Sequence, residues 1–250
     1  MVDFHSHILP GIDDGAESVE EALEMLRSAY NDGIDTVVST SHIYIENESD
    51  IEAFLNARNA SYEILKNAMD SNGGDFPEIR LGCEVHLKNN IDEMKDLVKL
   101  AVDGTDYILL EMPYTNWKPE IFELVYNISI LGVKPIMAHI ERFLKHRRDF
   151  YNLKSVGALF QLNADAFLHK SMRKELLDLF YDGYAHVMGS DMHNTEDRVN
   201  NLKSAYQIIE KYYGKEFAEF TENNARRILD NKSPLRTELP KLGFIKKIRL

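Results

Sequence analysis

The chain contains little cysteine and lacks long apolar segments. Its 250 residues include a single cysteine, Cys83, so an intramolecular disulfide framework like that of small secreted domains is excluded. The absence of any run of about 18 apolar residues excludes a transmembrane helix, and neither end has the pattern of a signal peptide. These absences lead us to expect a cytoplasmic protein.

Positive charge is also scarce. The 29 lysines and arginines are outnumbered by 41 aspartates and glutamates, so the formal net charge is −12. Because a nucleic-acid binder normally carries a basic face, this balance argues against nucleic acid as a partner. A composition of 44% hydrophobic and 28% charged residues is typical of a globular protein. The length allows one large barrel or two ordinary domains.

Short apolar or β-branched runs alternate with helical patterns along the chain. One helix is predicted after a capping box at 18–21 and ends at Gly33, and others at 120–131 and 173–181 precede Gly132 and Gly183. Another helical pattern covers 50–69. The strand-like runs begin near residues 2, 36, 78, 106, 133, 157 and 185. This order is typical of parallel βα units and predicts an α/β fold whose seven strands close into a (β/α) barrel.

Polar side chains able to bind metal follow the predicted strands. His5 and His7 are two residues apart, so in an extended chain both imidazoles face the same side, and Asp14 can return a carboxylate to them. In such barrels the chemistry lies at the C-terminal ends of the strands. The candidate metal ligands at these ends are His5, His7, Asp14, His42, Glu84, Glu111, His139, Asp191 and His193.

The number of these groups indicates how many ions they serve. Nine ligands exceed the needs of one ion and are generous for two, so three ions fit best. The four carboxylates sum to −4, so three divalent ions would leave a net charge of +2, which suits a phosphate dianion. Imidazole and carboxylate ligands without thiolate favour manganese, iron or zinc.

The motifs occur in the order found in a known superfamily. They are His-Ser-His at 5–7, Gly-Ile-Asp-Asp-Gly at 11–15, Ser-Thr-Ser-His at 39–42, Gly-Cys-Glu at 82–84, Ala-His-Ile-Glu-Arg at 138–142 and Ser-Asp-Met-His-Asn at 190–194. The chain thus resembles the polymerase-and-histidinol-phosphatase (PHP) superfamily. Within it, the chain is most similar to the metal-dependent tyrosine phosphatases of bacterial capsule and exopolysaccharide operons. The resemblance runs from residue 2 to about residue 230.

That resemblance implies a fold, a cofactor and a reaction. The implied fold is one distorted seven-stranded, TIM-like barrel over residues 1–230. The implied cofactor is three metal ions, commonly manganese, bound by the nine residues above. The implied reaction is dephosphorylation of a tyrosine autokinase that controls polysaccharide assembly. By position, Arg142 and Arg198 correspond to the phosphate-binding arginines. The planar donor fork of arginine independently suits phosphate oxygens. The sequence departs from the relatives at His86, where an aromatic residue is usual, and at Asn224, where proline is frequent.

Other functions compete with a tyrosine phosphatase that uses a metal-activated hydroxide. A thiol phosphatase needs Cys-x5-Arg, but Asn89 stands six residues after Cys83. A small-molecule phosphatase acting on histidinol phosphate or a nucleotide remains the alternative within the class. From other classes come a metal-dependent amidohydrolase, which often uses a carbamylated lysine where Glu111 stands, and a catalytically silent binding module. The tail at 231–250 is expected to pack on the barrel or to be mobile.

Overall fold

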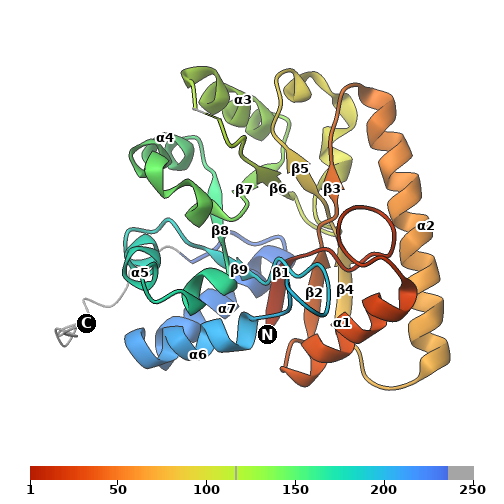
Figure 1. Cartoon of the computed structure of the whole chain (residues 1–250). Helices are drawn as coiled ribbons and strands as arrows, with labels where there is room; N and C mark the ends of the chain where they lie inside the picture. Colours follow the sequence, from red (N-terminus) through yellow and green to blue (C-terminus); the bar gives the residue numbers. More distant parts are fainter. Residues whose placement is uncertain (116, 236–250) are drawn as a thin grey trace.

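Strands and helices alternate along most of the described chain, which ends in two helices (Figure 1). The computed structural model describes residues 1–115 and 117–235. With η for 3₁₀ helices, the elements are β1 (Val2–Ser6), α1 (Val19–Asn31), β2 (Thr36–Ser39), β3 (His42–Ile43), α2 (Glu48–Asn72), β4 (Glu78–Leu81), β5 (Glu84–His86), η1 (Ile91–Glu93), η2 (Lys95–Leu100), β6 (Tyr107–Glu111), α3 (Pro119–Ile130), β7 (Lys134–Met137), η3 (Ile140–Asp149), α4 (Phe150–Ser155), β8 (Leu159–Asn163), η4 (Asp165–Leu168), α5 (Arg173–Tyr181), β9 (Val187–Gly189), α6 (Leu202–Tyr213) and α7 (Lys215–Leu229).

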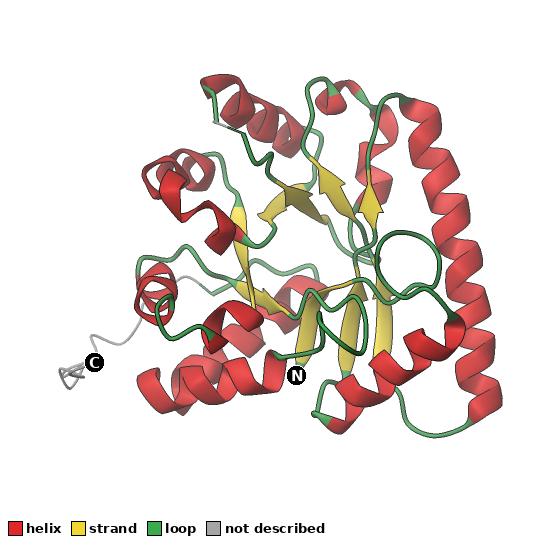
Figure 2. Ribbon diagram, in the orientation of Figure 1, coloured by secondary structure: helices red, strands yellow, loops and turns green. Residues whose placement is uncertain are grey.

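The strands form a curled parallel sheet with helices around it (Figure 2). Hydrogen bonds join them into one sheet of order β1-β2-β4 and another of order β3-β5-β6-β7-β8-β9. The α/β class is therefore confirmed, but the expected count of seven strands is not. Two predicted strands are each interrupted, so that β3 follows β2 and β5 follows β4. At these breaks the two neighbouring segments stay paired through hydrogen bonds outside the regular strands. Gly82 N donates to Ser39 O (2.8 Å), and Glu84 N donates to Thr40 O (3.1 Å).

The two ends of this curled sheet meet at β1 and β9. The Asp191 N–H donates to His5 O (2.8 Å), the His7 N–H donates to Met192 O (2.9 Å), and Ser6 and Met192 form an isolated parallel bridge. A methyl group on Gly189 would place its carbon 2.3 Å from His5 Cβ, so only glycine allows this close approach. The contact brings the residues that follow β9 beside those that follow β1.

The helices cover the sheet with apolar faces of helical period. Helix α1 buries Ala22, Leu26 and Ala29 on one side, as its sequence predicted. Its N-cap is Ser18, which accepts a hydrogen bond from Glu21 N (3.2 Å). The Glu21 carboxylate accepts instead from Glu17 N (2.9 Å), so the predicted capping box is only half formed.

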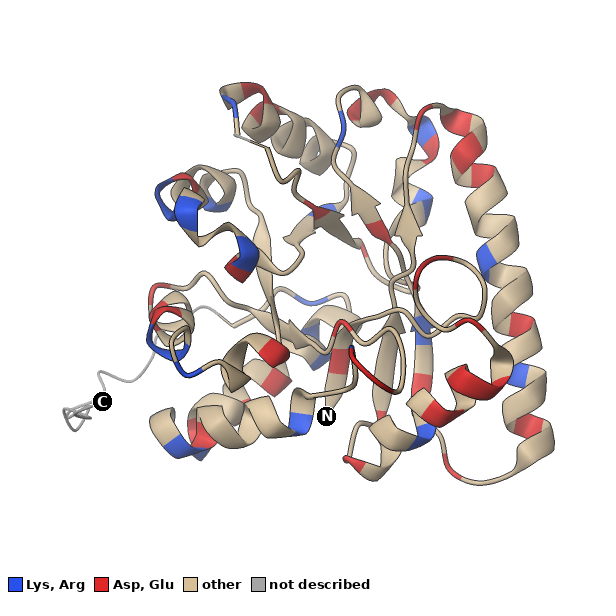
Figure 3. Cartoon of the chain, in the orientation of Figure 1, with Lys and Arg blue, Asp and Glu red and all other residues tan. Residues whose placement is uncertain are grey.

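Acidic and basic residues are distributed over the helices and loops, with many acidic residues on α1 and α2 (Figure 3). Within the described residues, no helix combines the length and apolar character needed to cross a membrane. The start of the tail packs on α7, because Arg227 Nε donates to Ser233 O (2.8 Å) and Leu235 N donates to Asn224 Oδ1 (2.8 Å). The expectation for 236–250 lies outside the described residues.

Candidate metal centre

The nine side chains singled out in the sequence come together on the side of the sheet where the carboxyl ends of β1, β2, β4, β6, β7 and β9 lie. His5 lies in β1, His42 begins β3, Glu84 begins β5 and Glu111 ends β6. The other five lie in loops that follow β1, β7 and β9. Most of the nine are buried; the exceptions are His42, which is partly buried, and Asp14, which is 62% exposed. Parallel strands place their carboxyl ends at one edge, and this common direction explains the convergence.

One group of donor atoms lies between β1, β5 and the loop after β9. The Nε2 atoms of His5 and His7 are 3.0 Å apart, and Glu84 Oε2 lies 3.0 Å from the first and 3.4 Å from the second. Asp191 Oδ1 is 3.4 Å from His5 Nε2 and 3.5 Å from His7 Nε2. Two imidazoles and two carboxylates thus point into a single small space.

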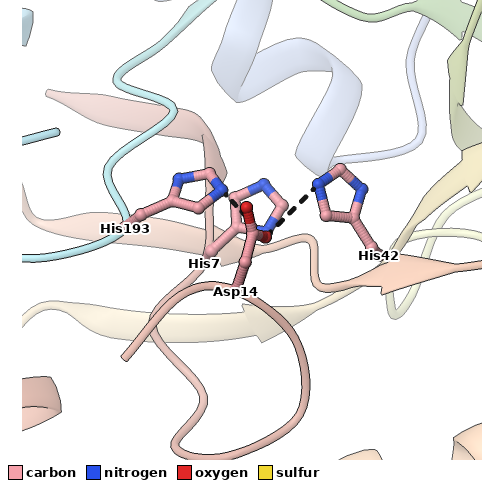
Figure 4. A group of neighbouring side chains, drawn as sticks. All are labelled: His7, Asp14, His42 and His193. Carbon is pink, nitrogen blue, oxygen red and sulfur yellow. Dashed lines mark ion pairs between the residues drawn. The ribbon is translucent and has the colours of Figure 1, made fainter. Parts of the chain in front are cut away.

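A second group surrounds the exposed carboxylate of Asp14 (Figure 4). Asp14 Oδ1 lies 3.3 Å from His193 Nε2 and 3.6 Å from His42 Nε2. The His7 and His193 rings stack with centroids 3.8 Å apart, which joins this group to the first.

A third group extends toward β6 and β7. His139 Nε2 lies 2.8 Å from Glu84 Oε1 and 3.6 Å from Glu111 Oε1. On the other side, His42 Nδ1 is 3.2 Å from Glu84 Oε2. Glu84 therefore contacts side chains of both the first and the third groups and lies at the middle of the cluster.

These distances fit divalent cations. Donors that share one cation at about 2.1 Å lie about 3.0–3.4 Å from each other. Among the described residues, His42 Nδ1 and His193 Nε2 are buried without a hydrogen bond, although they lie 3.2 and 3.3 Å from the carboxylate oxygens of Glu84 and Asp14. Buried polar atoms normally have partners, so unpaired imidazole nitrogens beside carboxylates indicate a metal-binding arrangement. The donor set of imidazole and carboxylate without thiolate suits manganese, iron or zinc.

Backbone strain is concentrated at two of the nine residues. His139 has φ 31° and Asp191 has φ 56°, both in the left-handed region that residues other than glycine rarely occupy. The strain at Asp191 is held by the bond from its N–H to His5 O, and Gln161 Oε1 accepts from His139 N (2.7 Å). Such conformations persist where the surrounding structure imposes them, often at functional sites.

Neighbouring positive groups keep two buried carboxylates of the cluster ionised. Burial alone would raise the pKa of Glu84, yet His5, His139 and His7 hold it well below its usual value. Burial would likewise raise the pKa of Asp191, but His5, His7 and Arg142 lower it well below its usual range. Both carboxylates are therefore ionised at neutral pH, which is the form that binds a cation.

Three supporting residues were not identified as functional from the sequence. Asp13 accepts from the backbone N–H of His42 (2.8 Å) and lies 2.7 Å from His7 Nδ1, which orients that ring. Gln161 Oε1 is 3.1 Å from His5 Nδ1, and Asn163 Nδ2 donates to Asp191 Oδ2 (2.7 Å). Side chains that fix the second nitrogen of a ligating histidine are common around metals. The only indication of their role in the sequence was that they lie near the ends of predicted strands.

The two predicted arginines lie at the edge of the cluster and approach opposite oxygens of Asp191. Arg142 Nη2 donates to Asp191 Oδ2 (2.5 Å), and its Nη1 donates to the Tyr114 hydroxyl (3.0 Å). Arg198 Nη2 lies 3.1 Å from Asp191 Oδ1, and its Nη1 lies 3.4 Å from Asp14 Oδ2. Both are about one-third exposed, at 34% and 39%, so they can reach a bound ligand.

Cys83, Trp117 and His186 make contacts outside the cluster. Cys83 is buried, its thiol donates to Leu100 O (3.1 Å), and burial raises its pKa to about 12. Trp117 packs on His146 with ring centroids 4.5 Å apart. His186 accepts from Phe160 N (3.1 Å), at the other end of the strands. The thiol therefore takes no part in the cluster.

The fold and the donor groups together define an α/β protein with a candidate metal centre at the carboxyl ends of a curled parallel sheet. Residues 1–230 match the family model described as capsular polysaccharide synthesis, CpsB/CapC. The chain belongs to this CpsB/CapC family, and the resemblance stated from the motifs is confirmed.

Individual relatives agree with this assignment. Tyrosine-protein phosphatase CpsB of Streptococcus agalactiae is 31% identical over 249 residues, covering 92% of this chain and 99% of the relative. Tyrosine-protein phosphatase YwqE of Bacillus subtilis is 28% identical over 250 residues and covers 94% of each chain. The chain spans nearly the full length of both relatives.

Solved structures show the same architecture. A crystal structure from work on YwqE of Bacillus subtilis and CpsB of Streptococcus pneumoniae, described as metal-dependent tyrosine phosphatases, matches with a TM-score of 0.78. Its sequence identity is 27%, and the match covers 94% of this chain and 97% of that one. A variant organophosphorus hydrolase matches with a TM-score of 0.55 at 12% identity over 91% and 92% of the two chains, which shows a shared fold alone.

Proposed function

We propose that the chain is a metal-dependent phosphomonoesterase that hydrolyses phosphotyrosine on a protein during capsular or exopolysaccharide synthesis. The observation that carries this proposal is the set of three overlapping donor groups, with two arginines meeting at the shared ligand Asp191. The relatives named tyrosine-protein phosphatases support the same activity. The expected partner is a bacterial tyrosine autokinase in the cytoplasm, and the expected catalytic domain covers residues 1–230.

The cofactor is proposed to be three divalent ions, with manganese as the expected metal and iron or zinc as alternatives. Their ligands would be the nine residues predicted from the sequence, among them Glu84, which contacts His5, His42 and His139. When bound, such ions supply Lewis-acid chemistry, which acidifies a water molecule and neutralises phosphate oxygens.

The side chains of the protein bind and orient the phosphate. Each guanidinium group has five N–H donors, and the contacts of Arg142 and Arg198 with neighbouring oxygens leave donors available for a ligand. Their planar forks fit two phosphate oxygens at once and can hold the group as its charge develops. Because Cys83 is buried away from the cluster, we expect no phosphocysteine intermediate.

The test is an assay of purified protein with defined metal content. After chelation and addition of each metal in turn, manganese should restore hydrolysis of a phosphotyrosine peptide more effectively than hydrolysis of histidinol phosphate. Elemental analysis of the active form should approach three ions per chain. Glu84→Gln should lose metal and activity, whereas Glu78→Gln, at an exposed carboxylate paired with Arg80, should keep both. Full activity with one ion per chain would contradict the three-metal proposal, and a preference for histidinol phosphate would contradict the substrate.

A further inference from the structure

An exposed aromatic side chain lies at the border of the metal centre. Tyr44 follows β3 by one residue, and it is 64% exposed. Its ring centroid is 6.0 Å from that of His42, a proposed ligand, and 5.5 Å from that of His86. Partial burial raises the pKa of the Tyr44 phenol, and the nearby carboxylates of Glu111 and Asp14 raise it further, which agrees with a position at the edge of the cluster.

The neighbouring ring of His86 is fixed in place. Its Nδ1 lies 2.9 Å from Glu111 Oε2, and its side chain is 29% exposed. The His86 ring therefore packs against the Tyr44 ring at a tilt of 42°, and Tyr44 remains 64% exposed. Within residues 1–115 and 117–235, the Tyr44 hydroxyl has no hydrogen-bond partner. Most of the surface of this side chain is therefore free to contact a ligand.

A second exposed tyrosine nearby has a different arrangement. Tyr114, at 56% exposure, accepts a hydrogen bond from Arg142 Nη1 through its hydroxyl, and its ring packs 5.3 Å from that of Phe143. Tyr114 thus holds an arginine, whereas Tyr44 makes tilted ring contacts with His42 and His86 and remains 64% exposed. The two tyrosines therefore differ in what they can contribute to a ligand.

We propose that Tyr44, supported by His86, contacts the aromatic ring of an aryl phosphate and sets a preference for aryl over alkyl phosphates. This inference rests on the proposed phosphatase function. A phosphate held beside Asp191 by Arg142 and Arg198 must carry its organic group outward, past the border of the cluster. Aromatic rings in offset or edge contact attract each other beyond simple burial of area. An alkyl phosphate cannot make that contact.

The experiment compares aryl and alkyl ligands of the full chain loaded with manganese. Steady-state kinetics would use a phosphotyrosine peptide, phenyl phosphate and β-glycerophosphate with wild type, Tyr44→Ala and Tyr44→Phe. Tyr44→Ala should raise KM for the two aryl substrates by about fivefold with little change in kcat, and leave β-glycerophosphate unaffected. Tyr44→Phe should behave as wild type, because the ring remains. The matched control is Tyr151→Ala in α4, where the tyrosine is 69% exposed and should be neutral.

Calorimetry separates this inference from the proposed activity. Wild type should bind phenylphosphonate more tightly than methylphosphonate, and Tyr44→Ala should bind the two alike. If wild type shows this preference, Tyr44→Ala loses it and wild type hydrolyses no phosphotyrosine, the proposed function fails and the aryl contact of Tyr44 stands. Three results would each overturn the role of Tyr44. They are equal losses of affinity for aryl and alkyl ligands in Tyr44→Ala, an unchanged KM for aryl substrates in that variant, and no binding of phenylphosphonate by wild type.

Discussion

The Cβ of an alanine at position 189 would lie 2.3 Å from His5 Cβ, so β9 and β1 approach each other within a distance that only glycine permits. This contact sets His5 beside Asp191, whose N–H donates to His5 O. The relative position of two proposed ligands that lie far apart in the sequence therefore depends on glycine at position 189.

Gly189→Ala is expected to disturb the metal centre. The added methyl group would force β1 and β9 apart, displace His5 and weaken metal binding, so bound metal and phosphatase activity should fall together. Gly82→Ala is a milder comparison, because its methyl would lie 3.1 Å from Val102 Cγ2 at the nearest, so that side chain needs to move by only a few tenths of an ångström. Elemental analysis and a thermal unfolding curve measure both variants. Wild-type metal content in Gly189→Ala would show that the contact is not required.

Arg142→Ala and Arg198→Ala should lower kcat/KM by roughly 10²-fold, or about 2.7 kcal/mol, as expected for loss of a donor to developing negative charge. Metal content should remain unchanged, because a guanidinium does not bind cations and Asn163 still donates to Asp191. Lysine should restore activity only in part, since it lacks the planar fork. Arg147→Ala, which removes an exposed pair with Asp182, is the control. Lost metal in either alanine variant would make that arginine structural.

Cys83→Ala should retain phosphatase activity. With a pKa near 12, the buried thiol is protonated at neutral pH and cannot act as a thiolate nucleophile. The loss of its hydrogen bond to Leu100 O should lower the free energy of unfolding by about 1 kcal/mol. Kinetics and urea unfolding, together with treatment by a thiol alkylating reagent, test this. Inactivation of a folded Cys83→Ala variant would place the thiol in the reaction.

His186 should make the fold less stable as the pH falls. Burial, with Lys154 nearby, lowers its pKa to about 4 in the folded chain, against 6.5 when unfolded. The unfolded chain therefore binds a proton first, so stability is retained above pH 6.5 and declines as the pH falls toward 4. Between pH 7 and 5 this group should contribute a loss of about 1–2 kcal/mol.

The variant that isolates this effect is His186→Asn. The asparagine oxygen can still accept from Phe160 N, but it does not titrate. Urea unfolding at pH 7 and pH 5 should show a smaller pH-dependent loss for the variant than for wild type. Equal losses in the two proteins would show that His186 titrates normally in the folded state.

Local patterns in the sequence determined the class of fold and the candidate ligands. Alternating apolar runs and helical periods predicted α1, α3 and α5 to within one or two residues, because caps and glycines end helices by local chemistry. The spacing of His5 and His7 predicted two imidazoles on one side of a strand. The structure places their Nε2 atoms 3.0 Å apart.

Only the tertiary structure decided how these parts meet. The breaks that divide the expected strands into β2 and β3, and into β4 and β5, depend on pairing between distant segments, which no local pattern encodes. The same is true of Asp13, whose carboxylate joins His7 to the backbone of His42. It is also true of Tyr44, which lies beside His86 because β3 pairs with β5. Contacts between residues far apart in the chain set these positions, so the sequence alone could indicate candidate ligands but not the residues that support them.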